Sequence, residues 1–366
     1  MAGYDVAIIG GGIIGTSAAA YLAEAGMTVA LVERERIAAG ASGRNSGVLQ
    51  HPFDAPLGTL HRRSIELYRE LSATEPDFRL PDQPHGLLVL GTDEAALARV
   101  AADVAADNPE LAPTLLAPTE LAALEPAIAP GLAACRLETA YPVAPAAATV
   151  AFAKRAERAG ARLRIGLGAT VARDGARVTG VALDSGELVA AGVVLVACGP
   201  WSPELIAEWP QRPPIRPVWG VVVTARIEQP PHAVLEESGI DLHGGSSDVL
   251  FSLVTAAGQS SVGSTFLAEQ PDADALVPTL LERGRRFVPG IGEPLGVRVC
   301  ARPVAFDGRP LIGAIGGVDG LFVCAGHGPW GISTGPASAE MVVAQISGAG
   351  GSTNESFDPA RWRQVG

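Results

Sequence analysis

The amino-terminal pattern of apolar and polar positions predicts two buried strands joined by a glycine turn and a helix. Residues 4–9 (YDVAII) are a β-branched, apolar run of the kind found in strands buried on both faces of a parallel sheet. A helix is expected over residues 13–25, before Gly26, which suits a left-handed cap. Residues 28–32 (TVALV) predict a second buried strand that ends at Glu33. The order is strand, glycine turn, helix, strand and acid.

The glycines of this turn have distinct expected roles. Gly10 permits the tight turn, Gly12 lets backbone amides approach a pyrophosphate, and Gly15 lets the helix pack against the strand. Glu33 follows about 20 residues later, where a carboxylate can accept hydrogen bonds from a ribose diol. The spacing therefore predicts a dinucleotide site. Glu33 disfavours the ribose phosphate of NADP, because two anions would face each other in a dry pocket, but it does not choose between NAD and FAD.

The rest of the chain alternates between helical and strand patterns. Further helices are predicted over residues 56–71, 93–106, 118–121 as a helix start, 145–159, 274–287 and 332–346. Further strands are predicted over residues 86–90, 192–197, 219–225, 249–255, 260–265 and 320–325. Three strand-like runs separated by Asp174-Gly175 and Ser185-Gly186, both good hairpin turns, predict a β-meander.

Two kinds of strand indicate two sheets. Residues 192–197 and 320–325 are short apolar runs of the buried parallel type and return the chain to the nucleotide fold. Residues 216–294 carry longer alternating strands, which predict an antiparallel sheet that can floor a substrate pocket. The proline-rich segment 112–145 belongs outside the first sheet. The nucleotide domain is therefore expected to be assembled from three separated pieces.

Length and charge narrow the class of protein. A chain of 366 residues exceeds what a single core usually supports, so two domains are expected. A net charge of −12 argues against nucleic acid or an anionic membrane as the main partner. Lys154 is the only lysine, so no other residue can act as a lysine base, a Schiff-base amine or an oxygen-activating ammonium group.

The cysteines and the chain start predict a cytoplasmic protein. The cysteines lie far apart without metal-ligand spacing and are interpreted as reduced thiols: Cys135, Cys198, Cys300 and Cys324. Met1 is followed almost directly by the first strand, so no signal peptide is expected. No apolar run approaches 18 residues, so no membrane span is expected.

A set of motifs spread over nearly the whole chain resembles a known family. The motifs are GGGIIG at 10–15 with Glu33, GASGRNSG at 40–47, VACGPWS at 196–202, RP-x3-DG-x-P-x-IG at 302–313 and GHG-x2-G at 326–331. Together they resemble the FAD-dependent amine and amino-acid oxidases of the D-amino-acid oxidase, glycine oxidase and sarcosine oxidase group. The resemblance selects FAD over NAD, because a plain dehydrogenase would not need the distant carboxy-terminal glycine block.

The resemblance implies an α/β fold with two domains. A Rossmann-like FAD-binding domain, with a parallel sheet and a β-meander, is expected over residues 1–84, 142–215 and 296–366. An α+β substrate domain built on an antiparallel sheet is expected over residues 85–141 and 216–295. The residues expected to contact FAD are Gly10, Gly12, Ile13, Ile14, Gly15, Glu33, Arg34, Ser42, Gly43, Arg44, Asn45, Ser46, Gly47, Val171, Ala197, Gly199, Trp201, Arg302, Gly328, Gly331, Ile332 and Ser333.

The implied chemistry is removal of hydride from a carbon bearing nitrogen, followed by hydrolysis of the imine. The helix that begins near Ile332 would point its amino end at the pyrimidine ring of the flavin, where negative charge builds on reduction. Two alternatives stay open. One is oxidation of a 2-hydroxy acid or polyol, and the other is an FAD-carrying subunit that is inactive without a partner chain.

Four residues are candidates for the catalytic site, each with a structural alternative. Arg302 would hold a substrate carboxylate with its bidentate fork, or it could pair with Asp307. His51 matches a histidine near the flavin in sarcosine oxidase-like proteins, or it is a satisfied buried histidine. His327 either touches substrate or is structural, and Trp330 either forms a pocket wall or packs.

Departures from the family concern the flavin linkage and the electron acceptor. Cys300 stands where sarcosine oxidase-like members carry the cysteine that bonds the flavin, but its surroundings resemble the non-covalent branch, so non-covalent FAD is expected. The lysine that those enzymes use with dioxygen is absent from the antiparallel sheet, which favours another acceptor, although glycine oxidase-like proteins manage without it. The expected partners are a small substrate with a carboxylate and either dioxygen or another acceptor, and a homo-oligomer stays open.

Overall fold

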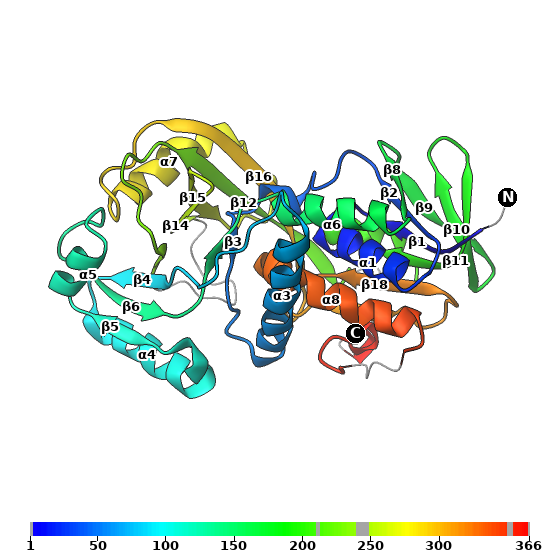
Figure 1. Ribbon diagram of the computed structural model, residues 1–366, viewed down its shortest axis with the longest axis horizontal. Coiled ribbons are helices and arrows are strands. Elements are labelled where there is room, and N and C mark those ends of the chain that lie inside the picture. Colours follow the sequence, from blue (N-terminus) through cyan, green and yellow to red (C-terminus); the bar gives the residue numbers. More distant parts are fainter. Residues whose placement is uncertain (1–2, 210–212, 239–248, 350–353, 365–366) are drawn as a thin grey trace.

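The computed structural model describes residues 3–209, 213–238, 249–349 and 354–364, which form two lobes, each built on a sheet (Figure 1). None of the helices in these ranges combines the length and the apolar composition that crossing a bilayer requires. A two-stranded sheet, β3 (Val48–Leu49) with β7 (Tyr141–Pro142), lies apart from both large sheets.

The first large sheet is the predicted parallel sheet with its meander. Its main order is β17-β18-β11-β1-β2-β8, and β10 and β9 extend from β11. The strands are β1 (Tyr4–Ile9), β2 (Val29–Glu33), β8 (Arg162–Ile165), β9 (Ala169–Asp174), β10 (Arg177–Leu183), β11 (Leu188–Val196), β17 (Leu311–Ala314) and β18 (Leu321–Ala325). Parallel pairing joins β1 to β2 and β11, β11 to β18, and β2 to β8. The central strands thus come from both ends and the middle of the chain.

Helices cover one face of this sheet and the meander covers the other. The helices are α1 (Ile13–Glu24), α3 (Ala55–Thr74), α6 (Ala147–Arg158) and α8 (Gly331–Ile346), with α1 packed between α6 and α8 and α3 packed on α8. Val6 and Ile8 of β1 face the helices, whereas Ala7 and Ile9 face the core under the meander. Burial on both faces explains why β1 is apolar at nearly every position.

The β-meander is confirmed, with one difference in its last strand. The turns at Asp174-Gly175 and Ser185-Gly186 join β9 to β10 and β10 to β11. The sequence treats the last meander strand and residues 192–197 as separate runs. In the structure β11 is one strand whose first residues pair with β10 and whose later residues pair with β1. A single strand thereby joins the antiparallel meander to the parallel sheet.

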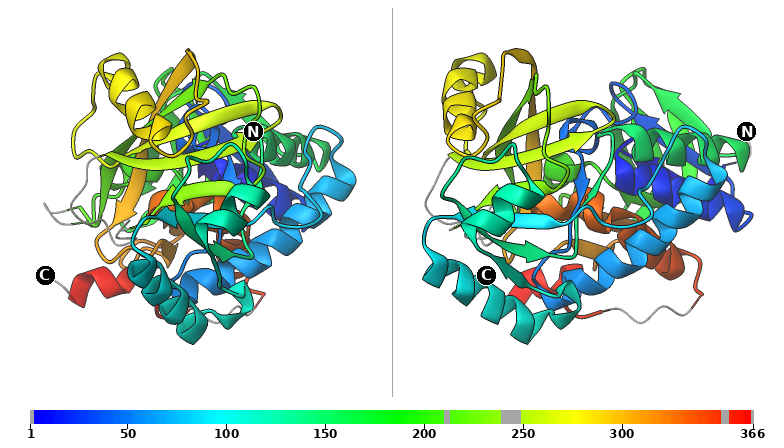
Figure 2. Two further views of the ribbon diagram at one scale, coloured as in Figure 1. Left: turned by 90° about the vertical axis from the view of Figure 1, so that its left-hand side faces the viewer. Right: turned by 60° about the vertical axis from the view of Figure 1, so that its left-hand side comes forward.

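The second large sheet is the predicted antiparallel floor. Its order is β16-β12-β15-β14-β13-β4-β6-β5, antiparallel except between β13 and β4. The strands are β4 (Leu87–Gly91), β5 (Thr114–Leu116), β6 (Ala133–Leu137), β12 (Ile215–Ala225), β13 (Val234–Glu237), β14 (Val249–Ala256), β15 (Gln259–Thr265) and β16 (Pro294–Ala305). Helix α7 (Ala273–Arg285) covers one face of β12, β14, β15 and β16 (Figure 2). Helices α4 (Glu94–Asp107) and α5 (Pro118–Leu124) pack at the far end, on the β4, β5 and β6 side.

The predicted long helices are confirmed, with ends that shift by a few residues. Asp93 caps α4 as expected, since its carboxylate accepts a hydrogen bond from the amide of Ala96 at 3.0 Å. Strand β16 was not among the predicted strands. It pairs with β12 from Pro294 to Ala305, so the antiparallel sheet extends beyond the predicted domain boundary at residue 296.

Candidate active site

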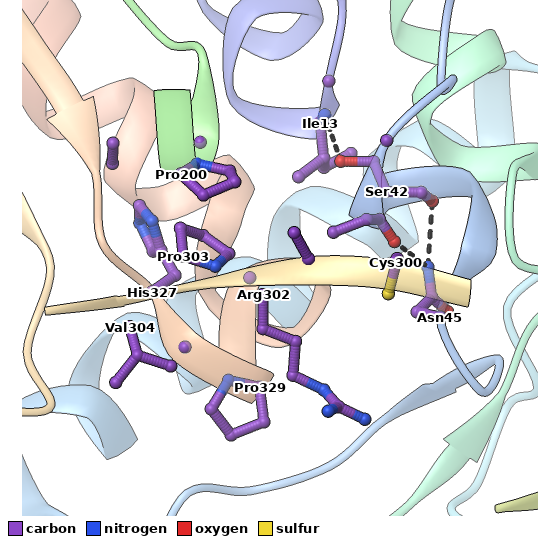
Figure 3. Close-up of a pocket in the computed structure, with 18 of the residues that line it drawn as sticks. Ile13, Ser42, Asn45, Pro200, Cys300, Arg302, Pro303, Val304, His327 and Pro329 are labelled. Carbon is purple, nitrogen blue, oxygen red and sulfur yellow. Dashed lines mark hydrogen bonds between the residues drawn. The ribbon is translucent and has the colours of Figure 1, made fainter. Parts of the chain in front are cut away.

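A cavity of about 1170 Å³ lies between the two sheets. One end is lined by the turn after β1 and by the end of β2, and the other by β16 and the start of α8. In Figure 3, β16 crosses the site and carries Cys300 and Arg302. Ser42 and Asn45 lie toward one end of this strand, and His327 lies toward the other. Segments that are distant in sequence therefore enclose one continuous space.

The turn after β1 has the geometry that its glycines predict. Gly10 has a φ of +116°, and a Cβ atom there would lie 2.5 Å from the carbonyl oxygen of Ala197. A Cβ atom on Gly15 would lie 1.9 Å from the carbonyl oxygen of Gly10, which confirms that Gly15 is needed where α1 packs against the turn. Gly12, Ile13 and Ile14 line the cavity, and Gly15 does not.

The acid at the end of β2 lines the same end of the cavity. Glu33 accepts hydrogen bonds from the amides of Gly11 at 2.7 Å and Glu35 at 2.9 Å, so its carboxylate is held in one orientation. The guanidinium of Arg34 lies over the ring of Trp201, 4.5 Å from its centroid, and both line the cavity. Ala197 and Gly199, also predicted, line it as well.

The loop at residues 40–47 forms a short helix, α2 (Ala41–Arg44), under the start of α1. The Ser42 hydroxyl accepts a hydrogen bond from the Ile13 amide at 3.0 Å, and Asn45 donates to the carbonyl oxygen of Ser42 at 2.9 Å. Ser42, Arg44, Asn45 and Ser46 line the cavity.

The two other predicted loop glycines, Gly43 and Gly47, do not line the cavity. A Cβ atom on Gly43 would lie 2.1 Å from the carbonyl oxygen of Ala38. A Cβ atom on Gly47 would lie 2.7 Å from the carbonyl oxygen of Val143. Their role is close packing of the loop.

The amino end of α8 opens on the opposite end of the cavity. Gly331, Ile332 and Ser333 line the cavity together with Gly328, and the helix has no side-chain cap. The first amides of a helix have no partner within the helix, and its dipole places positive potential at this end. The position of this helix end agrees with its predicted use toward the flavin.

Arg302 lies on the cavity side of β16 without a carboxylate partner among the described residues. Its guanidinium donates to the carbonyl oxygen of Thr265 at 2.7 Å and to the Ser264 hydroxyl at 2.6 Å, and it lies 4.5 Å from the centroid of the Phe266 ring. The alternative pairing with Asp307 is wrong, because Asp307 pairs with Arg361. Burial lowers the pKa of Arg302, yet a guanidinium stays charged, so the cavity holds a fixed positive charge.

Three further predicted residues line the cavity: His327, Trp330 and Cys300. His327 is 2% exposed, its Nε2 lies 3.0 Å from the Ser338 hydroxyl, and burial lowers its pKa to about 3, so it stays neutral. Trp330 is the residue before α8 and is partly buried. Burial raises the pKa of the Cys300 thiol, which disfavours the thiolate needed for covalent attachment.

Two predicted residues do not reach the cavity. The His51 ring packs edge-on against His61, with centroids 5.1 Å apart, and does not line the cavity, so the structure does not support a catalytic role. The preceding residue, Gln50, faces the cavity instead. Val171 packs in the core under the meander and does not line the cavity, whereas Thr170 does. In both cases the preceding residue lines the cavity instead, because the side chains of neighbouring residues in extended backbone point in opposite directions.

Comparison with known families decides the class of protein. The family model described as "FAD dependent oxidoreductase" (DAO) matches residues 5–345. The chain belongs to the DAO family. Membership confirms the predicted fold class, the cofactor FAD and an oxidoreductase activity.

Relatives of this DAO-family chain include proteins of matching length. A glycine oxidase from Bacillus licheniformis is 29% identical over 370 residues, covering 94% of this chain and 93% of the relative. A D-amino acid dehydrogenase from Xanthobacter autotrophicus is 25% identical, covering 94% and 95%. The crystal structure of glycine oxidase from Geobacillus kaustophilus superposes with a TM-score of 0.82 at 27% identity, covering 98% and 97%.

The described residues of this DAO-family site fit FAD at both ends. At one end, Gly10 and Gly12 leave room that side chains would fill, the amino end of α1 faces the cavity, and Glu33 stands at the end of β2. These groups suit a pyrophosphate and a ribose. At the other end, the amino end of α8 suits the negative charge that develops on a reduced flavin.

Two polar residues of the site were missed from the sequence. Gln50 and Glu236 line the cavity, and the Gln50 side chain donates to the Glu236 carboxyl at 3.3 Å. The only local signal for Glu236 is the acidic pair after an apolar start in Val234–Glu237, which is equally typical of a solvated strand end. Its position depends on pairing with β14 and β4.

Proposed function

We propose that this protein oxidises the carbon–nitrogen bond of a small amino acid or secondary amine that carries a free carboxylate. The product is an imine, which water hydrolyses to a carbonyl compound and an amine or ammonia. FAD, when bound, supplies the two-electron acceptor for the hydride. The chain supplies binding, orientation and electrostatics.

The observation that carries the proposal is the unpaired cation of Arg302. Its guanidinium has five N–H groups, and the described residues accept from it only through Thr265 and Ser264. A carboxylate bound at the remaining donors would neutralise the buried charge with charge-assisted hydrogen bonds. Such binding fixes one end of the substrate and so orients its α-carbon.

The names of the relatives support nitrogen chemistry over the 2-hydroxy acid alternative. The Bacillus and Xanthobacter relatives are named for glycine and for D-amino acids. No observation on the described residues favours a subunit that is inactive without a partner, since the cavity brings together both groups of motifs.

The position of the single lysine supports an electron acceptor other than dioxygen. Lys154 lies on α6, where its ammonium pairs with Asp77 at 2.5 Å, and it does not line the cavity. Without an ammonium group in the cavity to assist dioxygen, we expect an acceptor other than dioxygen to react faster.

We also propose a cytoplasmic location and the division into an FAD-binding and a substrate domain. The free cysteines at all four positions support the former, because cytoplasmic thiols stay reduced. The separate packing of the two large sheets supports the latter, with residues 296–305 moved to the substrate domain by the pairing of β16.

An anaerobic screen of flavin bleaching tests the proposal. The holoprotein is mixed with amino acids, N-methyl amines and 2-hydroxy acids, and the flavin absorbance is recorded. We expect bleaching by a carboxylate-bearing amine. Bleaching by hydroxy acids alone would contradict the proposal. Peroxide release compared with dye reduction, using the same substrate, tests the acceptor.

A further inference from the structure

Glu236 places a carboxyl group on the cavity face of the antiparallel sheet. Its neighbours on β13, Leu235 and Glu237, face the other side, where Glu237 pairs with Arg283 of α7 at 2.7 Å. Alternation along the strand therefore directs Glu236 into the cavity, next to Ser252 on the adjacent strand β14.

The surroundings of Glu236 contain no opposing charge among the described residues. Its neighbours on the adjacent strands are Val89 of β4 and Ser252 of β14. The side-chain amide of Gln50, from the segment before α3, completes the surroundings. Desolvation of the carboxyl in these surroundings raises the pKa of Glu236 to about 7, and the hydrogen bond from Gln50 opposes the rise. A partly buried carboxyl without a cationic partner among the described residues can pair with a cationic group of a ligand.

Other charged groups lie at this end of the cavity. Arg44 donates to the carbonyl oxygen of Val299 at 3.3 Å, and Arg298 donates to the hydroxyls of Thr224 and Ser261 at 2.6 and 2.8 Å. Asp54 pairs with Arg309 at 2.8 Å. His51, beside Gln50, faces away from the cavity, and burial lowers its pKa, so it adds no charge at neutral pH. Glu236 thus lines the cavity as an acidic group, and Arg302 lines it as a basic group.

Gln50 connects Glu236 to the helix end that faces the flavin position. Its backbone amide donates to the Ser333 hydroxyl in the first turn of α8 at 3.0 Å, while its side chain donates to Glu236. Gln50 alone thus bridges the Glu236 carboxyl and the amino end of α8. This places it in the substrate part of the cavity, away from the adenosine end at Glu33.

The separation of Glu236 and Arg302 suits a small zwitterion. The Arg302 guanidinium lies directly above Gly220 of β12 and donates a hydrogen bond to the hydroxyl of Ser264 on β15. Strand β14 lies between β15 and β13, so the two groups are about 10 Å apart at a spacing of about 4.8 Å per strand. With a hydrogen bond of about 2.8 Å at each end, about 4 Å remains, which is the scale of a small amino acid.

We propose that Glu236 binds the ammonium group of the substrate and accepts one of its protons. This inference rests on the proposed function. The N–H bond breaks, the proton moves to a carboxylate oxygen of Glu236, and the electron pair stays on nitrogen as a lone pair. The neutral amine can then lose hydride from its α-carbon to the bound cofactor as nitrogen forms the double bond. Glu236 is ionised before this transfer and protonated after it.

The pH dependence of kcat/KM in the holoprotein tests this proposal. In the wild type, kcat/KM rises with pH through a limb near pH 7, because Glu236 must be ionised to accept the proton. In Glu236→Gln the limb moves up toward the pKa of the free substrate amine, and kcat/KM at pH 7 falls about 100-fold. Glu236→Asp restores the limb at a lower rate. Glu228→Gln, which removes an exposed carboxylate after β12, keeps the wild-type profile.

Binding of acetate separates this role from a structural one. Acetate has the carboxylate and lacks the nitrogen, so its perturbation of the flavin spectrum should have the same Kd in the wild type and Glu236→Gln. The proposal is overturned if Glu236→Gln keeps the limb near pH 7 with kcat/KM within about threefold of wild type. It is also overturned if this variant loses acetate binding as severely as turnover. If no amino acid bleaches the wild type, the proposed function itself fails, and that result needs no variant.

Discussion

Replacing Arg302 with methionine separates a substrate-binding arginine from a structural one. The guanidinium lies over Phe266 and donates to Ser264 and Thr265, but no described carboxylate neutralises it. Methionine keeps much of the side-chain volume and contact with the ring while removing the charge and the donors. The free protein then loses a partly buried charge that has no carboxylate partner among the described residues.

The magnitude follows from the missing partner. Truncating one member of a buried charge pair costs about 2–5 kcal/mol of binding, and about 1.4 kcal/mol is a factor of ten, so kcat/KM should fall by about 30-fold to about 4000-fold. Stability should not fall in parallel. Exchanging an uncompensated buried charge for an apolar side chain is often neutral or stabilising, so we expect Tm to drop by no more than about 3 °C.

The assay combines anaerobic stopped-flow reduction of the flavin, FAD content and thermal unfolding of the same samples. Arg302→Lys is the matched variant, because it keeps the charge but lacks the bidentate fork, and its loss should be smaller, about tenfold. The reasoning is refuted if Arg302→Met reduces the flavin as fast as the wild type. It is refuted as well if Tm falls steeply while kcat/KM per bound FAD is unchanged.

Three further predictions concern the cofactor and acid stability. Gly10→Ala should abolish FAD binding, because the new Cβ would lie 2.5 Å from the carbonyl oxygen of Ala197. Gly26→Ala, also at positive φ but with no atom within 4 Å, should keep FAD in an equilibrium-dialysis measurement. Acid-precipitated protein should release its yellow colour, and Cys300→Ser should behave identically; colour retained by the pellet of wild type alone would show a covalent link. The free energy of unfolding should fall by about 1.4 kcal/mol per pH unit for His327 as pH drops below about 6.5, because the folded pKa of about 3 lies below the unfolded one. In urea titrations His327→Gln should lessen that slope, and an unchanged slope would contradict the assignment.

The sequence predicted the nucleotide-binding half well because its signals are local. A buried strand, a glycine turn, a helix and an acid follow one another within 4–33, and each has a steric or electrostatic reason to be there. The structure places Gly10 at positive φ and Glu33 at the end of β2, as that pattern requires. Helix α8 could be placed for the same reason.

The substrate end depended on pairing between distant residues. Glu236 faces the cavity because β13 pairs in parallel with β4, which lies far earlier in the chain, and no local pattern encodes that register. His51 was predicted at the site, whereas Gln50 lines the cavity, because a shift of one residue in extended backbone changes which side chain faces the cavity. Strand β16 was not predicted as a strand, because its pairing with β12 joins segments that are distant in the sequence.

The central claim is that the turn after β1, the end of β2, β16 and the amino end of α8 enclose one FAD. The most direct measurement is the absorbance spectrum of the purified protein, followed by quantification of the flavin released by acid. The account predicts a yellow protein, or one that turns yellow on adding FAD, with about one FAD per chain. A colourless protein that takes up no added FAD would contradict it.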